Sequence, residues 1–294
     1  MLASRIRRQI RLTTGGDGRP PLQYLQPPGD PGLFGPQSEA WRVHADFTSM
    51  MVGGIGALVL QALHPLALAG VWDHSTFRED LPGRLARTAQ FIAATTYGGT
   101  AMAEQALARV RAIHQHVRGE HLDGRPYRAD DPRLLYWVHL AETTSFLGAY
   151  RHLLEPAMPQ ARRDRYFGEM TRIPLSLGCT PEALPGGRIA STEAQARADM
   201  LALRDELEYS DRARFVVGML ENRPLAGVPA PLQDLLVQAA FAQLPGWAWP
   251  LMRRTPPGPL RRHALDLAVR ALALPVRHAL RDGIAAHARR RMQG

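Results

Sequence analysis

The stretch Met50-Met-Val-Gly-Gly-Ile-Gly-Ala-Leu-Val-Leu-Gln-Ala-Leu-His-Pro-Leu-Ala-Leu-Ala-Gly-Val71 contains only two polar side chains, Gln61 and His64. Its length is sufficient to span a bilayer. However, glycines weaken its first half, Pro65 interrupts its second half, and no basic cluster flanks either end as a membrane topology would favour. The stretch therefore predicts a fully buried central helix that is kinked or broken at His64-Pro65.

Composition limits the possible folds. The chain has 294 residues, of which 45% are hydrophobic, so it can bury a large core. No stretch alternates apolar and polar residues as a half-buried strand would, and no repeat is visible. The sequence predicts an all-α protein with one large helical domain over residues 37–294. A Pro- and Gly-rich lead-in over residues 1–36 precedes it, and we expect its Gly15–Gly35 part to cover the surface without helices or strands.

Capping residues and Pro/Gly breaks place the helices. Ser38 is a good N-cap with Glu39 in the first turn, and Asp130-Asp131-Pro132 caps another helix. A helix over residues 84–95 precedes the helix that carries His114, which should end near Gly119. Further helices are expected at residues 159–177, 192–207, 210–222, 230–244 and 259–289.

Charge and targeting signals indicate the partners and the compartment. All 36 basic residues are arginines, against 27 acids, but they are spread along the chain without a basic arm, so we do not expect nucleic-acid binding. The Arg- and Ala-rich segment Arg261–Arg291 is a candidate for peripheral contact with an anionic membrane surface. A single cysteine fits a reducing compartment, and no apolar run follows the N-terminal arginines as in a secretory signal. We therefore expect a cytoplasmic protein.

The segment Arg111-Ala-Ile-His-Gln-His-Val-Arg118-Gly119 carries the candidate chemistry. It is typical of the C-terminal half of a helix, in which Arg111, His114 and Arg118 would fall in one stripe. Apolar residues flank that stripe, namely Leu107, Val110, Ile113 and Val117. Two cations around an imidazole, beside a face that should be buried, suit a ligand that is half apolar and carries acidic groups.

The common catalytic motifs are absent from the sequence. It has no His-Glu-x-x-His or Glu-x-x-His pair, no Gly-x-Ser-x-Gly elbow and no Gly-Lys of a P-loop. Cys179 lacks the surrounding pattern of haem-thiolate oxygenases and is expected to be a buried bystander. What remains are helical imidazoles with arginines beside them. A proximal histidine on haem iron with arginines on the propionates satisfies this pattern, and so does a salt-bridging surface histidine.

Several motifs, in consistent order over roughly residues 30 to 250, resemble the MpaB-type oxygenase family, which includes the latex-clearing rubber oxygenases. They are Asp30-Pro-Gly-Leu-Phe-Gly-Pro36, Trp41-Arg-Val-His-Ala-Asp46, Leu60-Gln-Ala-Leu-His-Pro-Leu-Ala-Leu-Ala-Gly-Val71, His74-Ser-x-Phe77, Gly83-Arg-Leu-Ala-Arg-Thr88, the Arg111–Gly119 segment, Gly124-Arg-Pro-Tyr-x-Ala-Asp-Asp-Pro132 and Trp137-Val-His139. The resemblance implies an all-helical, globin-like domain that encloses haem b and activates dioxygen.

The resemblance also implies roles for single residues. His114, rather than its neighbour His116, resembles the proximal iron ligand, and it would be the metal-binding residue. Arg111 and Arg118 resemble the flanking haem-supporting arginines. His139 looks like the family's second histidine, a further cofactor contact.

Arg84 and Thr88 resemble a distal pair beside dioxygen, and His64 looks like the histidine of the family's His-Pro motif. The chain departs from the pattern at two positions. Arg87 stands where rubber oxygenases have a lysine, and Gly56 stands where close relatives often have an arginine. The acidic base that rubber oxygenases use beside the oxygen site has no evident counterpart in the sequence.

These observations predict a haem b-dependent oxygenase that uses dioxygen on a small apolar organic substrate. The expected pocket walls, Met50 to Val71 with Phe91 and Ile92, carry little charge. Two alternatives retain haem: a non-catalytic sensor or carrier, and a peroxidase-like enzyme. A helical scaffold without a cofactor, in which His64, His114 and His139 are ordinary core residues, is the third.

Overall fold

The apolar stretch forms two helices that meet at a sharp angle in the computed structural model, which describes residues 7–10, 21–222 and 229–293. Helix α3 (Phe47–Ala62) and helix α4 (Pro65–His74) are bent by 103° relative to one another. His64 is the extended N-cap of α4 and Pro65 occupies its first turn, where the missing N–H costs nothing. The predicted break at His64-Pro65 is confirmed.

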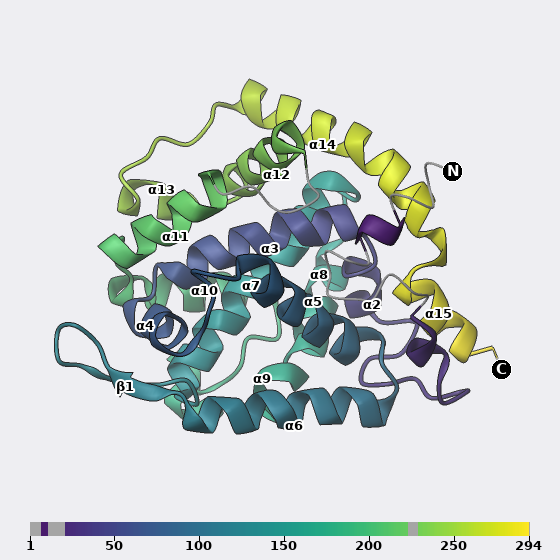
Figure 1. Ribbon diagram of the computed structural model, residues 1–294, viewed down its shortest axis with the longest axis horizontal. Coiled ribbons are helices and arrows are strands. Elements are labelled where there is room, and N and C mark those ends of the chain that lie inside the picture. Colours follow the sequence, from purple (N-terminus) through teal and green to yellow (C-terminus); the bar gives the residue numbers. More distant parts are fainter. Residues whose placement is uncertain (1–6, 11–20, 223–228, 294) are drawn as a thin grey trace.

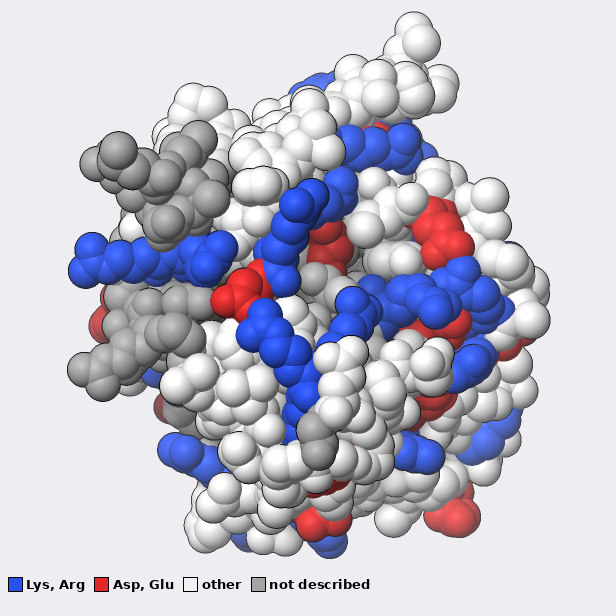
Figure 2. All heavy atoms as spheres, turned by 90° about the vertical axis from the view of Figure 1, so that its right-hand side faces the viewer, with Lys and Arg blue, Asp and Glu red and all other residues white. Residues whose placement is uncertain are grey.

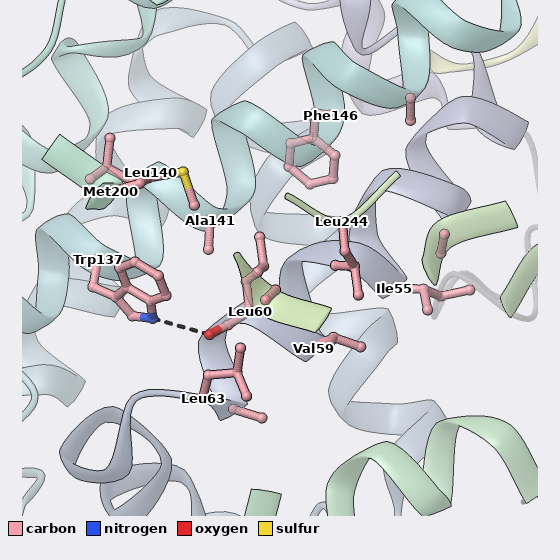
Figure 3. Packing of buried hydrophobic residues seen from close by; sticks show 14 of the residues in the cluster. Ile55, Val59, Leu60, Leu63, Trp137, Leu140, Ala141, Phe146, Met200 and Leu244 are labelled. Carbon is pink, nitrogen blue, oxygen red and sulfur yellow. Dashed lines mark hydrogen bonds between the residues drawn. The ribbon is translucent and has the colours of Figure 1, made fainter. Parts of the chain in front are cut away.

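Helix α3 is the centre of the molecule. It packs along α7 (Pro132–Leu153), and α11 (Asp211–Asn222), α12 (Ala230–Ala242) and α14 (Pro259–Ala279) also contact it. The two central helices approach so closely that a Cβ on Gly53 would lie 2.9 Å from the Cα of Phe146. Trp137 of α7 donates from Nε1 to the carbonyl oxygen of Leu60, 3.2 Å away (Figure 3). The core therefore forms around the α3–α7 pair.

The remaining elements surround this pair (Figure 1). The α-helices are α2 (Glu39–Val43), α5 (Leu81–Tyr97), α6 (Thr100–His116), α8 (Gln160–Met170), α9 (Arg172–Ser176), α10 (Glu193–Ala202), α13 (Ala248–Leu251) and α15 (Ile284–Arg291). The 3-10 helices are η1 (Leu22–Leu25), η2 (Pro181–Ala183), η3 (Pro185–Gly187), η4 (Arg204–Glu206) and η5 (Leu280–Asp282). Ser38 and Asp131 cap α2 and α7 with their side chains, as predicted. The all-α prediction is confirmed.

Several expectations about local structure were wrong. Residues 159–177, 192–207 and 259–289 each form more than one helix, with breaks at Thr171, Leu203 and Gly283. The lead-in contains the 3-10 helix η1, although Gly15–Pro20 lie outside the described residues. A hairpin of two short antiparallel strands, β1 (Arg118–Glu120) and β2 (Pro126–Arg128), follows α6.

The hairpin ends α6 at His116, so Arg118 is not on the helix as predicted. Val117 is extended, and Arg118 pairs with Arg128 across the hairpin. The cause is a tertiary contact of Tyr127 on β2. Its side chain is buried, and its hydroxyl donates to Asp73 of α4 at 2.7 Å. The same hydroxyl lies so close to Gly119 of β1 that a Cβ there would be only 2.5 Å away. Three-residue strands are too short to produce a period-2 signal.

The lead-in is attached to the start of α6 by the buried guanidinium of Arg291 and the half-buried carboxylate of Asp30. Arg291 of α15, 1% exposed, donates to backbone carbonyl oxygens of Tyr24, Asp30, Tyr97 and Gly98. The Asp30 carboxylate accepts from both the backbone N–H and the hydroxyl of Thr100, each at 2.7 Å. The lead-in and the C-terminal helix thus fix the first turn of α6.

Within the described residues, no single helix has the length and apolar composition needed to cross a membrane. The bent pair of α3 and α4 meets that test only when its two helices are taken together.

Candidate functional site

His114 is half-buried and lies in the last turns of α6, the helix at the lower edge of the molecule in Figure 1. Its Nδ1 atom is buried and has no hydrogen-bond partner. Burial lowers the pKa of the imidazole; Arg84 contributes in the same direction and Asp130 opposes it. The ring is therefore held neutral, with a lone pair free for a ligand.

Arg84 lies in the first turn of α5, and its positive charge acts on both His114 and Glu142. Its pKa is lowered by burial and by the neighbouring Arg87, while the carboxylate of Glu142 raises it. One of its guanidinium nitrogens donates to the hydroxyl of Ser75 at 3.2 Å. Arg84 thus lies within electrostatic reach of both His114 and Glu142.

Glu142 of α7 is a site residue that the sequence analysis missed. It is the sole acid in α7, and its Oε1 accepts from Gln61 Nε2 of α3 at 3.3 Å. Burial raises its pKa to about 7, although Gln61 and Arg84 both favour the charged form. Its side chain is half-buried. A lone carboxylate on a largely apolar helix is the signal that could have identified it.

Three of the predicted site residues, two arginines and a threonine, are exposed. Arg111 is exposed, and its guanidinium packs beside Gly178. Arg118, exposed on β1, donates to the carbonyl oxygen of Gln115 at 2.6 Å. Thr88 is exposed, and its hydroxyl donates to the carbonyl oxygen of Arg84, one turn earlier, at 3.2 Å. Arg111 thus lies on α6, one turn before His114, whereas Arg118 lies on the hairpin that follows α6.

The expected buried face beside the stripe forms only in part. Leu107 is buried, and Val110 and Val117 are half-buried. Ile113, by contrast, is 52% exposed, because α6 contacts the body mainly through α5 and α9 and leaves its other side open. The prediction of a buried apolar flank beside the stripe was thus wrong at Ile113.

His139 lies on α7, three residues before Glu142. It is buried, and its ring stacks on Tyr136 with ring centroids 6.4 Å apart. Burial lowers its pKa to about 3, so it stays neutral across the physiological range. It lies about one helical turn before Glu142 on α7.

His64 lies in a separate pocket. Its Nε2 is 3.4 Å from Glu206, whose carboxylate has its pKa lowered to about 2 by this contact and by Arg133. The pocket has a volume of about 100 Å³ and includes Tyr127 and Asp131 in its lining. The structure therefore groups His64 with Glu206 and Arg133, and brings Arg84, Glu142 and Gln61 together elsewhere.

One face of α3 is less buried than the rest, and its Gln61 end contacts Glu142. Met50, Gly54, Leu58 and Gln61 are half-buried, whereas the other residues from Val52 to Ala62 are buried. Their spacing of three and four residues places them in one stripe. Phe91 and Ile92 of α5 are also half-buried. Apart from Gln61, these side chains are apolar.

Gly56 points to the opposite side of α3, about 200° from Gly54 at 100° per residue. A Cβ there would meet Ser145 of α7 at 3.6 Å and the carbonyl oxygen of Ala240 of α12 at 3.8 Å. A cavity of about 20 Å³ adjoins it. Gly56 thus lies where α3, α7 and α12 pack together, away from the half-buried stripe of α3.

One protein family matches most of the chain. The family model described as "ER-bound oxygenase mpaB/B'/Rubber oxygenase, catalytic domain" matches residues 41–278. No curated protein and no solved structure matches the chain. The matched segment contains His114, Arg84, Glu142 and Gln61, and it covers most of the described helices. The chain belongs to the mpaB and rubber oxygenase catalytic-domain family and is a member of a family of oxygenases.

Proposed function

We propose that this protein is a haem b-dependent oxygenase that uses dioxygen on a small apolar organic substrate, with His114 as the iron ligand. The observation that carries the proposal is the buried, unpartnered Nδ1 of His114 beside Arg84. A buried polar atom without a partner is a candidate position for an absent ligand. The Nδ1 of His64 is also buried without a partner, so it is the family motif around His114 and the nearby charge of Arg84 that favour His114 as the ligand.

The residues around His114 fit haem b. A neutral imidazole is the form that binds iron, and both burial and Arg84 favour that form. Arg111 and Arg118 are exposed on either side, where they can pair with carboxylates such as the propionates of haem. Among the residues that the structure describes, no group of three or more His, Cys, Asp or Glu side chains could hold a metal ion by itself. A single histidine is the ligand set that haem needs from a protein.

When bound, haem b would supply the iron that activates dioxygen. The chain's own residues supply the surrounding polarity. Arg84 holds a positive charge in a largely buried position, where it can bind and orient a polar or negatively charged group. The Thr88 hydroxyl, one turn later, is a second donor once it turns away from the Arg84 carbonyl oxygen.

Glu142 supplies the proton chemistry. Because its pKa lies at about 7, its carboxyl can accept a proton and release it again near neutral pH. Gln61 keeps Oε1 in place, so that Oε2 is the atom free to exchange the proton. We assign Glu142 the role of general base, the role for which the sequence showed no residue.

The apolar stripe of α3 supports an apolar substrate. Met50, Gly54 and Leu58 present no charge, and Phe91 and Ile92 of α5 are similarly apolar. A hydrocarbon-like substrate would lose little by leaving water for such surroundings. Oxidative cleavage of an alkene and hydroxylation both suit these surroundings.

Haem binding tests the proposal directly. The protein, expressed with haem available, should show a Soret absorption band, and His114→Ala should abolish or shift it. His116→Ala is the matched control, because His116 is exposed two residues away and its ring contacts only its own helix at Ala112. A wild type without a Soret band, or an identical band in His114→Ala, would contradict the assignment.

Oxygen consumption separates the oxygenase from the other haem proteins. The ferrous protein should consume dioxygen when candidate alkenes are added, and Glu142→Gln should slow consumption by about a hundredfold or more, as loss of a general base does. Reversible dioxygen binding without consumption would indicate a sensor or carrier. Turnover that requires added peroxide would indicate a peroxidase-like enzyme.

A further inference from the structure

Helix α14 is apolar on two opposite faces. On the inner face, Leu265 and Val269 are buried against the body of the protein. On the outer face, Leu260, Leu267 and Leu274 are 87%, 50% and 63% exposed. A helix that packs through one face needs only that face to be apolar, so the fold does not account for the outer leucines.

The three outer leucines form one ridge. Their seven-residue spacing keeps them within about 40° of one another around the helix axis and spans about 21 Å along it. Ala264 and Ala271, also exposed, lie in the same stripe. The ridge carries no negative charge, because the sole acid of α14, Asp266, is 3.4 Å from His152 and is largely covered.

Arginines flank both ends of this ridge. Arg261 and Arg262 are exposed in the first turn of α14 and donate only to Gln238 and to the carbonyl oxygen of Pro257. Arg281 is exposed beyond the last turn. None of the three forms an ion pair with a carboxylate of the described residues. Figure 2 shows arginine side chains gathered over the face that carries the end of α14 and α15.

We propose that α14 is a docking surface for anionic lipid membranes. The ridge of Leu260, Leu267 and Leu274 would lie in the boundary between headgroups and acyl chains, with the helix parallel to the membrane plane. Arg261, Arg262 and Arg281 would contact the negatively charged headgroups, each favouring binding by about fivefold. The net charge of +9 acts in the same direction.

A second copy of the chain fits the ridge less well. The leucines and the two alanines have the a/d spacing of a coiled coil, so the flanking e and g positions would meet in a dimer. These positions hold Arg261 on one side and Arg270 and Arg277 on the other, and Arg277 forms an ion pair with Asp46. Pairing two α14 helices would bring Arg261 and Arg270, which form no ion pair with a carboxylate of the described residues, close to the basic residues of the second helix. An anionic surface has the opposite charge.

Vesicle binding tests the docking surface, and it needs neither haem nor activity, so its outcome is independent of the proposed reaction. The full-length protein should sediment with vesicles of phosphatidylcholine containing about a third phosphatidylserine, and about tenfold or more less with phosphatidylcholine alone. The triple variant Leu260→Gln, Leu267→Gln, Leu274→Gln should reduce partitioning into the anionic vesicles by about tenfold or more. Because these side chains are exposed, circular dichroism should show an unchanged fold.

The chain offers a matched control in three other exposed leucines. Leu122, Leu175 and Leu201 are 80%, 48% and 47% exposed and lie outside α14, so their combined replacement by Gln should leave vesicle binding unchanged. Arg261→Gln, Arg262→Gln, Arg281→Gln should abolish the preference for anionic vesicles. Absence of wild-type binding, or an equal loss in the control variant, would overturn the proposal. So would a wild-type dimer that the α14 leucine variant converts to monomer without any vesicle binding.

Discussion

Gln61 of α3 donates a hydrogen bond to Glu142 of α7, with 3.3 Å between Nε2 and Oε1, across the interface of the two central helices. A carboxyl in such a place is expensive to ionise, and one amide donor and the nearby Arg84 offset only part of that cost. The pair therefore couples the proton occupancy of the candidate site to the stability of the core.

Replacement of Glu142 by Gln should remove one component of the pH dependence of folding. The pKa of Glu142 is raised from 4.5 to about 7, so between these values the folded protein holds a proton that the unfolded chain has lost. Stability is thus lost as pH rises through this window, by about 3 kcal/mol from this group. Urea unfolding at pH 5 and pH 8 measures it.

The informative quantity is the difference between the wild type and the variant, because other groups titrate as well. Glu142→Gln keeps an oxygen that can accept from Gln61, so the packing is conserved. Glu155→Gln is the control, since the Arg162 hydrogen bond lowers the pKa of that carboxyl instead. Equal pH dependence in the wild type and Glu142→Gln would show that Glu142 ionises freely.

The sequence predicted the central architecture because its determinants are local. Pro65 cannot continue the helix from Ala62, and Ser38 and Asp131 supply caps that any neighbouring backbone would use. The prediction that Arg118 lies on the helix was wrong, because its conformation depends on Tyr127. That side chain is buried against α4 and holds the hairpin in place. No property of the segment before Arg118 encodes that contact.

The candidate site was predictable in its cations and imidazole and not in its carboxylate. His114 and Arg84 are marked by motif resemblance, and the structure brings them together. Glu142 was overlooked because a glutamate in a helix is ordinarily solvated, and only the packing of α3 against α7 shows that this one is enclosed. His64 was predicted to lie beside dioxygen, and the structure shows its Nε2 3.4 Å from Glu206, a contact that no sequence motif indicates.

His44 should make the protein sensitive to mild acid. Burial lowers its pKa from 6.5 to about 3, and its ring nitrogens contact the hydroxyls of Thr96 and Tyr166 at 2.9 and 3.0 Å. The unfolded chain binds a proton below pH 6.5 that the folded protein refuses, so stability is lost as pH falls. Between pH 7 and pH 5 the loss from this group is about 2 kcal/mol.

His44→Gln should be less stable than the wild type at pH 7 and lose less stability on acidification, as measured by urea unfolding at both pH values. His116→Gln, at an exposed position, should retain the wild-type pH dependence. If the His44 variant lost as much stability as the wild type between pH 7 and pH 5, the buried ring would not be the acid-sensitive group.

Gly53→Ala should destabilise the contact between the two central helices. The added Cβ would lie 2.9 Å from the backbone of both Phe146 and Ser145, which can move only if α7 moves. The expected cost is about 1–3 kcal/mol in urea unfolding. Gly56→Ala is the matched control on the same helix, because its nearest contact would be 3.6 Å. It should be neutral or stabilising by up to about 1 kcal/mol, and equal costs at both positions would refute this packing.

Arg291→Gln should loosen the helix that carries His114, although it lies far from it in sequence. Arg291 donates to the carbonyl oxygens of Tyr24 and Asp30 in the lead-in. It also donates to those of Tyr97 and Gly98, at the end of α5 and immediately before α6 begins. Its removal leaves several buried carbonyl oxygens without a donor, which costs about 3 kcal/mol or more.

Hydrogen exchange distinguishes this connection from a general loss of stability. In Arg291→Gln, the amides around Thr100, which the Asp30 carboxylate holds, should exchange faster than those of α7. Arg290→Gln is the control, because Arg290 is exposed and pairs only with Asp282. Uniform acceleration throughout the protein would mean that Arg291 stabilises the whole fold. Faster exchange confined to the lead-in and α6 would show that the C-terminal helix positions the candidate haem ligand through the first turn of its helix.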